Sequence, residues 1–167
     1  MAGALIVTAE LGAEDFAWLD RLRRAHYPPE RNQVRAHLTI FYALPPSAET
    51  ELRSRLAQLA RRPAPKARIE GLIDLGGGVA FRIVSPDLDR IRSGLAPDLH
   101  GLLSSQDDAR WRPHITIQNK VPSKISRALI DSLARDFRPR SLAIRGLGLH
   151  RYLDGPWETL GVFAFRA

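Results

Sequence analysis

Apolar and polar residues follow two different periods along the chain. A strand is predicted where every second residue is apolar or where a short apolar run ends at turn residues, whereas apolar residues three or four apart predict a helix. The strand pattern covers residues 4–11, 36–44, 68–75, 79–85, 113–121, 141–152 and 158–165. The helical pattern covers residues 12–27, the stretch that carries Leu52, Leu56 and Leu59, residues 86–99 and residues 123–137. This mixture predicts an α+β fold.

Turn residues separate these elements. Pro28 and Pro29 end the first helix, because proline lacks an amide hydrogen and restricts the residue before it. Pro97 predicts a break in the third helix. The glycines at 76–78 predict a hairpin between two strands, and residues 154–156 predict a second turn near the end of the chain.

The order strand, helix, strand, strand occurs twice, and one motif marks both copies. His37-Leu38-Thr39-Ile40 recurs as His114-Ile115-Thr116-Ile117. Identical residues recur at the same offset elsewhere: Arg35 and Arg112, Pro45 and Pro122, Leu52 and Leu129, Leu56 and Leu133, Ala57 and Ala134, and Arg61 and Arg138. We therefore expect residues 1–167 to form a single domain built by internal duplication. Its two pseudo-symmetric lobes would each be an antiparallel sheet flanked by helices, with a central groove.

Composition and charge narrow the class of protein. The 167 residues are 44% hydrophobic and 26% charged, which is typical of a folded domain and argues against a disordered chain. The net charge of +7 and the sequence pI of about 10.7 favour an anionic partner such as nucleic acid or a nucleotide. A solvated basic surface that keeps the protein soluble is the alternative.

The chain lacks both cysteine and long apolar segments. The absence of cysteine excludes disulfides, thiolate nucleophiles and cysteine-based metal sites. The apolar stretch at residues 4–7 is too short for a secretory signal, and no segment has the roughly 20 apolar residues that span a bilayer. We expect a soluble cytoplasmic protein with no membrane partner.

Each copy of the motif places an imidazole and a hydroxyl on one strand face, because alternate residues of a strand share a face. Metal-free cleavage of a phosphodiester needs a base for the attacking water and an acid for the departing oxygen, on opposite sides of phosphorus. His37 and His114 meet this need, since an imidazole with an ordinary pKa of roughly 6.5 can serve in either role. Thr39 and Thr116 can donate hydrogen bonds to the phosphate oxygens. For either copy alone, a half-exposed packing histidine is the alternative.

Residues near the motifs are candidate substrate contacts. Arg35 and Arg112 precede the two histidines by the same spacing and could attract phosphate, or could simply be solvated. Phe41 continues the face of His37 and could stack on a base, with core packing as the alternative. Gln118 continues the face of His114 and could contact a base edge or a ribose hydroxyl.

Aromatic residues and further histidines complete the survey. Tyr152 and Trp157 flank the last predicted turn and could line the mouth of the groove, or could pack against the hairpin. His26, His100 and His150 have no partnered motif, so we interpret them as surface or packing residues.

No metal site is expected. Each motif offers one good nitrogen ligand, whereas hydrolytic zinc usually has three protein ligands. Asp107 and Asp108 form an acidic pair that we expect to lie in a solvated loop, with metal binding as the less favoured alternative. We therefore expect neither a metal nor another cofactor.

The paired motifs resemble the signatures of the 2H phosphoesterase superfamily. Over nearly its whole length the chain is similar to the bacterial 2′-5′ RNA ligase-like branch, also called RNA 2′,3′-cyclic phosphodiesterases, and residues 27–32 and 118–121 resemble one bacterial subgroup. The resemblance implies a bilobal fold, a metal-independent reaction on a cyclic or 2′-5′ phosphodiester, and His37, Thr39, His114 and Thr116 as the reacting groups. By analogy His114 would activate water and His37 would protonate the leaving oxygen, although sequence alone leaves this direction open.

Three functions remain open at this stage. The first is hydrolysis of a 2′,3′-cyclic phosphate or 2′-5′ linkage at RNA termini or in small nucleotides. The second is 2′-5′ RNA ligation, the chemical reverse of 2′-5′ cleavage, and the third is a module that binds RNA or nucleotides without turnover. The high concentration of water favours hydrolysis. Because one chain holds both motifs, we expect a monomer with no obligate protein partner.

Overall fold

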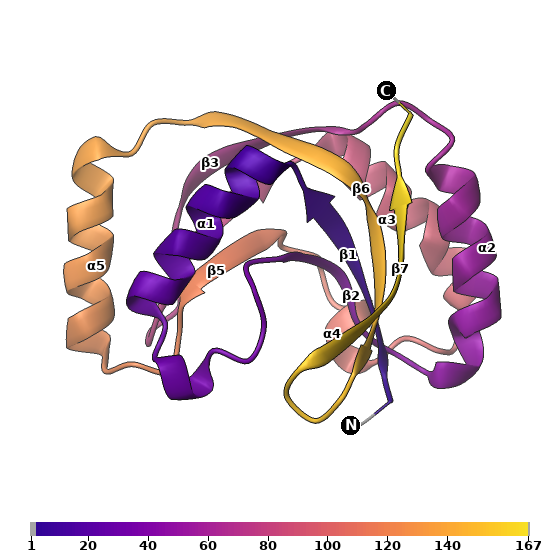
Figure 1. The fold of residues 1–167 in the computed structure, drawn as a ribbon, viewed down its shortest axis with the longest axis horizontal. Coiled ribbons are helices and arrows are strands. Elements are labelled where there is room, and N and C mark those ends of the chain that lie inside the picture. Colours follow the sequence, from indigo (N-terminus) through magenta and orange to yellow (C-terminus); the bar gives the residue numbers. More distant parts are fainter. Residues whose placement is uncertain (1–2, 167) are drawn as a thin grey trace.

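The strands form one antiparallel sheet that continues through both halves of the molecule (Figure 1). The computed structural model describes residues 3–166. Its strands are β1 (Leu5–Leu11), β2 (Leu38–Leu44), β3 (Lys66–Asp74), β4 (Val79–Val84), β5 (His114–Gln118), β6 (Arg140–Tyr152) and β7 (Trp157–Ala164). Its helices are α1 (Ala13–His26), α2 (Glu49–Leu59), α3 (Pro86–Leu95), α4 (Ser105–Asp108) and α5 (Ser123–Asp136). The predicted α+β class is confirmed.

The long strand β6 joins the two halves of the sheet. Its first residues pair with β3, from Ile69 opposite Arg140 to Lys66 opposite Ala143. Its remaining residues pair with β1 on one side and with β7 on the other. In Figure 1 this strand arches over the molecule from α5 to the terminal hairpin. The strand order is β2-β1-β6-β3-β4-β5, with β7 beside β6.

The two repeated units exchange their motif strands. The strand β2 of the first unit pairs with β1, which lies beside β6 and near the β6–β7 hairpin of the second unit. The strand β5 of the second unit pairs with β4 of the first unit. Each half of the sheet therefore takes one motif strand from one unit and a hairpin from the other. This exchange brings β2 and β5 into contact with each other.

Apolar strand faces bury the core of both halves. The motif leucine and isoleucines at 38, 40, 115 and 117 are all fully buried, as the period of two predicts. Helices cover the sheet on its outside: α1 lies along β5, α5 packs on β3 and β4, and α2 packs on β6 and β7. The apolar face of each helix packs against the sheet and so holds the helix in place relative to the motif strands.

Some boundaries differ from the sequence pattern. The third helix ends at Leu95, and a 3-10 turn follows over Ala96–Leu99, so Pro97 breaks the helix as predicted. The short helix α4 was not predicted; its start is fixed by Ser104, whose hydroxyl accepts a hydrogen bond from the amide of Asp107. Among residues 3–166, no helix has the length and apolar character needed to cross a bilayer.

Candidate active site

His37 and His114 have the same local setting. His37 Nδ1 lies 2.7 Å from the carbonyl oxygen of Arg35, and His114 Nδ1 lies 2.7 Å from the carbonyl oxygen of Arg112. A carbonyl oxygen only accepts hydrogen bonds, so in both rings Nδ1 carries a proton and Nε2 is left for a substrate. At both matched positions the backbone carbonyl holds the imidazole, while the side chains of Arg35 and Arg112 are exposed and their contact with phosphate stays a prediction.

The two imidazoles lie close enough for their charges to interact. Burial lowers the pKa of His37 to about 4, and the positive charges of Arg23, His150 and His114 act in the same direction. The hydrogen bond to the carbonyl of Arg35 opposes these effects without outweighing them. His37 is therefore neutral at pH 7, while part of its ring stays open to the adjoining pocket.

The two motif threonines differ in exposure. Thr39 is 4% exposed and lies opposite Thr8 of β1, whereas Thr116 is partly exposed and lies opposite Ala80 of β4. The backbone carbonyl of each threonine accepts a side-chain hydrogen bond. Trp111 Nε1 donates to Thr39 at 3.1 Å, and Arg23 Nη1 donates to Thr116 at 3.1 Å. The same position in each motif is thus held by a neutral donor in one copy and by a cation in the other.

Arg23 is a site residue that the sequence analysis missed. It is 4% exposed, its Nε donates to Asn32 Oδ1 at 2.8 Å, and its guanidinium lies 4.3 Å from the centre of the Tyr27 ring. Burial lowers its pKa, but a guanidinium stays charged in proteins. Its spacing of four residues from buried Leu19 was the available signal, because that spacing places both on one helix face.

Helix α1 also positions the segment before His37. Asp20 Oδ1 accepts a hydrogen bond from the backbone amide of Ala36 at 3.0 Å. Together with the bond from Arg23 to Asn32, this fixes the chain between α1 and β2 at two points. The same helix therefore touches the His37 segment and the carbonyl of Thr116.

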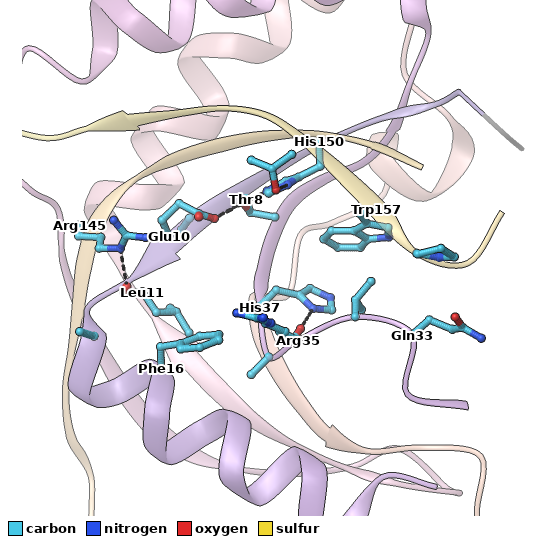
Figure 2. A pocket seen from close by; sticks show the side chains of 16 residues that line it. Thr8, Glu10, Leu11, Phe16, Gln33, Arg35, His37, Arg145, His150 and Trp157 are labelled. Atoms are coloured by element: carbon cyan, nitrogen blue, oxygen red, sulfur yellow. Dashed lines mark hydrogen bonds and ion pairs between the residues drawn. The ribbon is translucent and has the colours of Figure 1, made fainter. Parts of the chain in front are cut away.

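A cavity of about 650 Å³ opens beside His37 (Figure 2). It is lined by β1, the start of α1, residues 33–37 and the β6–β7 hairpin. His37, Arg35 and Trp157 line this cavity, and the rings of His37 and Trp157 have their centres 4.6 Å apart. His114, Thr39 and Thr116 do not line it, so the cavity adjoins the pair of motifs on the His37 side.

His150 is not a simple packing residue, which corrects the interpretation from sequence. It is buried, its Nε2 lies 2.9 Å from Thr8 Oγ1, and its Nδ1 lies 3.0 Å from Thr159 Oγ1. Thr8 in turn donates to Glu10 Oε2 at 2.7 Å. These four side chains come from β1, β6 and β7 and line the cavity of His37. The strand alternation places Thr8 and Glu10 on one face of β1, but no local sequence signal links them to His150 or Thr159, because strand pairing brings these residues together.

A β-bulge at the same point of both motifs corrects the prediction for Phe41. In β2, Thr39 lies opposite Thr8 but Phe41 lies opposite Val7, so one extra residue interrupts the alternation. Phe41 is consequently 0% exposed, with the guanidinium of Arg92 4.7 Å from its ring centre, and it cannot stack on a base in the groove. The physical reason is the inserted residue, which sends its side chain to the core.

Gln118 occupies the equivalent position of β5. Thr116 lies opposite Ala80 and Gln118 lies opposite Val79, so a bulge again precedes the residue. Gln118 is 3% exposed, and its Oε1 has no hydrogen-bond partner among residues 3–166. Its contact with a base edge or a ribose hydroxyl therefore stays a prediction.

Tyr152 and Asp107 also differ from expectation. Tyr152 pairs with Trp157 across the hairpin; Trp157 lines the cavity and Tyr152 does not. Asp107 is 1% exposed and not solvated: its carboxylate accepts from the amides of Tyr42 and Ala43 at 2.7 Å and 2.9 Å. Within the part of the chain that is described, no group of three or more His, Asp or Glu side chains could hold a metal ion.

Comparisons with known proteins agree with this arrangement. The 2′-5′ RNA ligase superfamily matches residues 11–156. Among solved structures, TT0787 of Thermus thermophilus is similar with a TM-score of 0.67 and 20% identity, over 98% of both chains. LigT of E. coli in complex with 3′-AMP has a TM-score of 0.61 and 20% identity, over 100% of both chains. At these identities the structural likeness shows the fold.

Comparison of the sequence with family models identifies the family, whereas comparison with individual curated proteins finds no relative. No curated protein matches the chain significantly. The family match spans both motifs and most of the chain. The protein therefore belongs to the 2′-5′ RNA ligase superfamily of 2H phosphoesterases.

Proposed function

We propose that the protein is a metal-independent phosphodiesterase that hydrolyses a 2′,3′-cyclic phosphate or a 2′-5′ linkage at RNA ends or in small nucleotides. The matched settings of His37 and His114 carry this proposal, because each ring is held through Nδ1 and offers Nε2 to a substrate. The family supports it, as does LigT of E. coli, which has been crystallised with 3′-AMP and with phosphate. The basic net charge of +7 suits an anionic substrate.

The neutral state of His37 assigns the two proton transfers. With its pKa lowered to about 4 by burial and by neighbouring cations, His37 accepts a proton at pH 7 more readily than it donates one. We therefore assign His37 as the base that removes a proton from the attacking water. His114 then donates a proton to the ribose oxygen as its bond to phosphorus breaks. This direction is opposite to the one that the family resemblance suggested.

Three further groups would act on the phosphate during this step. Attack of water increases the charge on the non-bridging oxygens, and donors aimed at that charge stabilise the transition state. The hydroxyls of Thr39 and Thr116 are suited to this role. Arg23 adds a buried positive charge that is near enough to His37 to lower its pKa. The products are a ribose hydroxyl and a terminal phosphate.

The test is turnover of 2′,3′-cyclic nucleotides and 2′-5′-linked dinucleotides by the protein and by His37→Ala and His114→Ala. Each substitution should lower kcat by roughly 100- to 10,000-fold, because each removes one proton-transfer group. Binding of a nucleoside 2′-monophosphate should change much less. The exposed His100 provides the control His100→Ala, which should turn over substrate at the parent rate.

Other outcomes would separate the rival functions. If the parent protein binds these nucleotides but neither hydrolyses them nor joins RNA ends, a binding module is the correct interpretation. If RNA ends with a 2′,3′-cyclic phosphate are joined faster than they are hydrolysed, the protein is a 2′-5′ RNA ligase. Gel filtration should give a monomer, since one chain holds both histidines.

A further inference from the structure

A network of polar side chains in the His37 cavity takes no part in the proposed reaction; Thr8 and His150 are buried, Glu10 is partly buried and Thr159 is exposed. Thr8 and Glu10 come from β1, His150 from β6 and Thr159 from β7. Figure 2 shows Glu10, Thr8 and His150 along one side of the cavity, with His37 facing them. Burying polar groups is costly unless they are hydrogen-bonded, so a network of this kind needs a reason.

The donors and acceptors of the network can be assigned in one direction. Thr8 has a single hydroxyl hydrogen, which it donates to Glu10 Oε2. Thr8 Oγ1 therefore accepts from His150 Nε2, and His150 Nδ1 lies 3.0 Å from the hydroxyl oxygen of Thr159. Glu10 Oε1 has no side-chain or backbone partner among the described residues and is accessible to solvent. The network thus ends in one unused acceptor.

Glu10 is a carboxylate in this setting. Burial raises its pKa, but the hydrogen bonds from His150 and Thr8 and the positive charges of His150 and Arg145 outweigh that effect, so the pKa is lowered overall. Arg145 also lines the cavity, where its Nε donates to the carbonyl of Leu11 at 3.1 Å. A carboxylate only accepts hydrogen bonds, and each oxygen can take more than one.

A glycine keeps the network in place. Gly148 of β6 lies opposite Thr8 in the sheet. A Cβ at this position would lie 2.5 Å from Thr8 Oγ1 and 2.7 Å from both Glu10 Oε2 and His150 Nε2. No other residue could leave these three atoms where they are. The backbone of β6 is therefore built around the polar groups.

Aromatic side chains bound the same cavity. Figure 2 shows Phe16 from α1 and Trp157 from β7 on opposite sides, with His37 between them. Aromatic side chains provide stacking surfaces for nucleobases. A nucleotide whose phosphate lies at His37 could place its base in this cavity, with one edge towards Glu10.

We propose that this cavity is a nucleobase subsite that selects guanine, with the Glu10 carboxylate accepting from N1–H and the N2 amino group. The inference rests on the proposed function. Guanine presents two adjacent donors on this edge. Adenine and cytosine present an acceptor beside their amino group, and uracil flanks its single N–H with two carbonyls, so each would place an oxygen or nitrogen lone pair against the carboxylate. Selection therefore follows from the charge and orientation of one side chain.

The test measures binding of the four nucleoside 2′-monophosphates by calorimetry, together with kcat/KM for the four 2′,3′-cyclic nucleotides. Guanosine 2′-monophosphate should bind at least about 10-fold more tightly than the others, which is the discrimination expected of one good bidentate pair. Glu10→Gln should remove most of this preference while binding of adenosine 2′-monophosphate changes less than about 3-fold. Glu51→Gln, at an exposed position of α2 outside the cavity, should keep the preference.

The outcomes separate this inference from the proposed function. Turnover of all four cyclic nucleotides without base preference would overturn the subsite and leave the phosphodiesterase standing. A guanine preference in binding that Glu10→Gln removes, without any turnover, would support the subsite and overturn the proposed reaction. If Glu10→Gln fails to fold by circular dichroism, Glu10→Asp retains the charge on a shorter side chain. A guanine preference unchanged in Glu10→Asp would overturn the proposal, and its loss would support it.

Discussion

Replacing Arg23 with glutamine tests whether one buried cation both stabilises the phosphate and sets the protonation of His37. Arg23 is 4% exposed, and no carboxylate lies within salt-bridge distance of its guanidinium among residues 3–166. Loss of a group that stabilises developing charge costs roughly 100- to 1,000-fold in kcat. The variant should therefore be slower by that amount with a 2′,3′-cyclic nucleotide.

The same substitution should move the acid side of the pH profile. Because His37 acts as a base in the proposed mechanism, kcat/KM rises as pH increases through its pKa of about 4. Arg23 lowers that pKa, so removing its charge shifts the rise to higher pH. Burial of the ring is the larger cause and remains, so the new midpoint should stay below the ordinary value of roughly 6.5.

The assay is kcat/KM from about pH 3.5 to about pH 8 for the parent, Arg23→Gln and the control Arg24→Gln. Arg24 is the next residue of α1, its side chain is 68% exposed, and it pairs with Asp20 at 3.4 Å. It should behave as the parent does. Thermal unfolding should accompany the kinetics, because the carbonyl of Thr116 loses a donor and an unpaired buried acceptor costs about 1–3 kcal/mol.

Two results would refute this reasoning. If Arg23→Gln folds and keeps both the kcat and the acid midpoint of Arg24→Gln, Arg23 contributes to neither property. If instead kcat/KM of the parent falls as pH rises above about 4, His37 is needed in its protonated form. His37 would then be the acid, and the direction suggested by the family resemblance would be correct.

Two further predictions concern stability and metal dependence. Asp107→Asn should lower the free energy of unfolding by about 1–3 kcal/mol in urea titrations, because one of the two oxygens that accept from the amides of Tyr42 and Ala43 is replaced by an amino group. The control Asp108→Asn, at an exposed position, should unfold as the parent does. An equal loss of stability in both variants would contradict the role assigned to Asp107. Turnover of 2′,3′-cyclic nucleotides should be unchanged in excess EDTA, because side chains supply both proton transfers; complete loss that added metal reverses would overturn the mechanism.

The sequence predicted those parts of the fold and site that depend on local periodicity. Residues 37–40 and 114–117 lie at or in strands, with their aliphatic members buried, because a period of two requires only the strand itself. The burial of Phe41 and Gln118 could not be predicted in this way. Their faces depend on an extra residue that appears only when β2 pairs with β1 and β5 pairs with β4.

Arg23 and His150 were not identified from the sequence for a different reason. Arg23 reaches Thr116 from a helix far away in the sequence, and His150 reaches Thr8 across two paired strands. Neither contact leaves a short motif, since the partners are chosen by tertiary packing. Of the two, Arg23 was easier to predict, because its spacing of four residues from buried Leu19 marks an inward-facing position on α1.

The two copies of the sequence motif supply one histidine each to the site, and a difference between their surroundings explains how the two histidines can take different roles. Both rings are fixed by the carbonyl two residues earlier, so the repeat alone would make them equivalent. The carbonyl of Thr39, however, is held by the neutral indole of Trp111, and that of Thr116 by charged Arg23. The positive charge of Arg23 acts on His37, whose pKa it lowers together with burial. Burial of the His37 ring and the nearby Arg23 charge together break the equivalence of the two imidazoles, which is the basis for assigning the proton acceptor to His37 in the proposed mechanism.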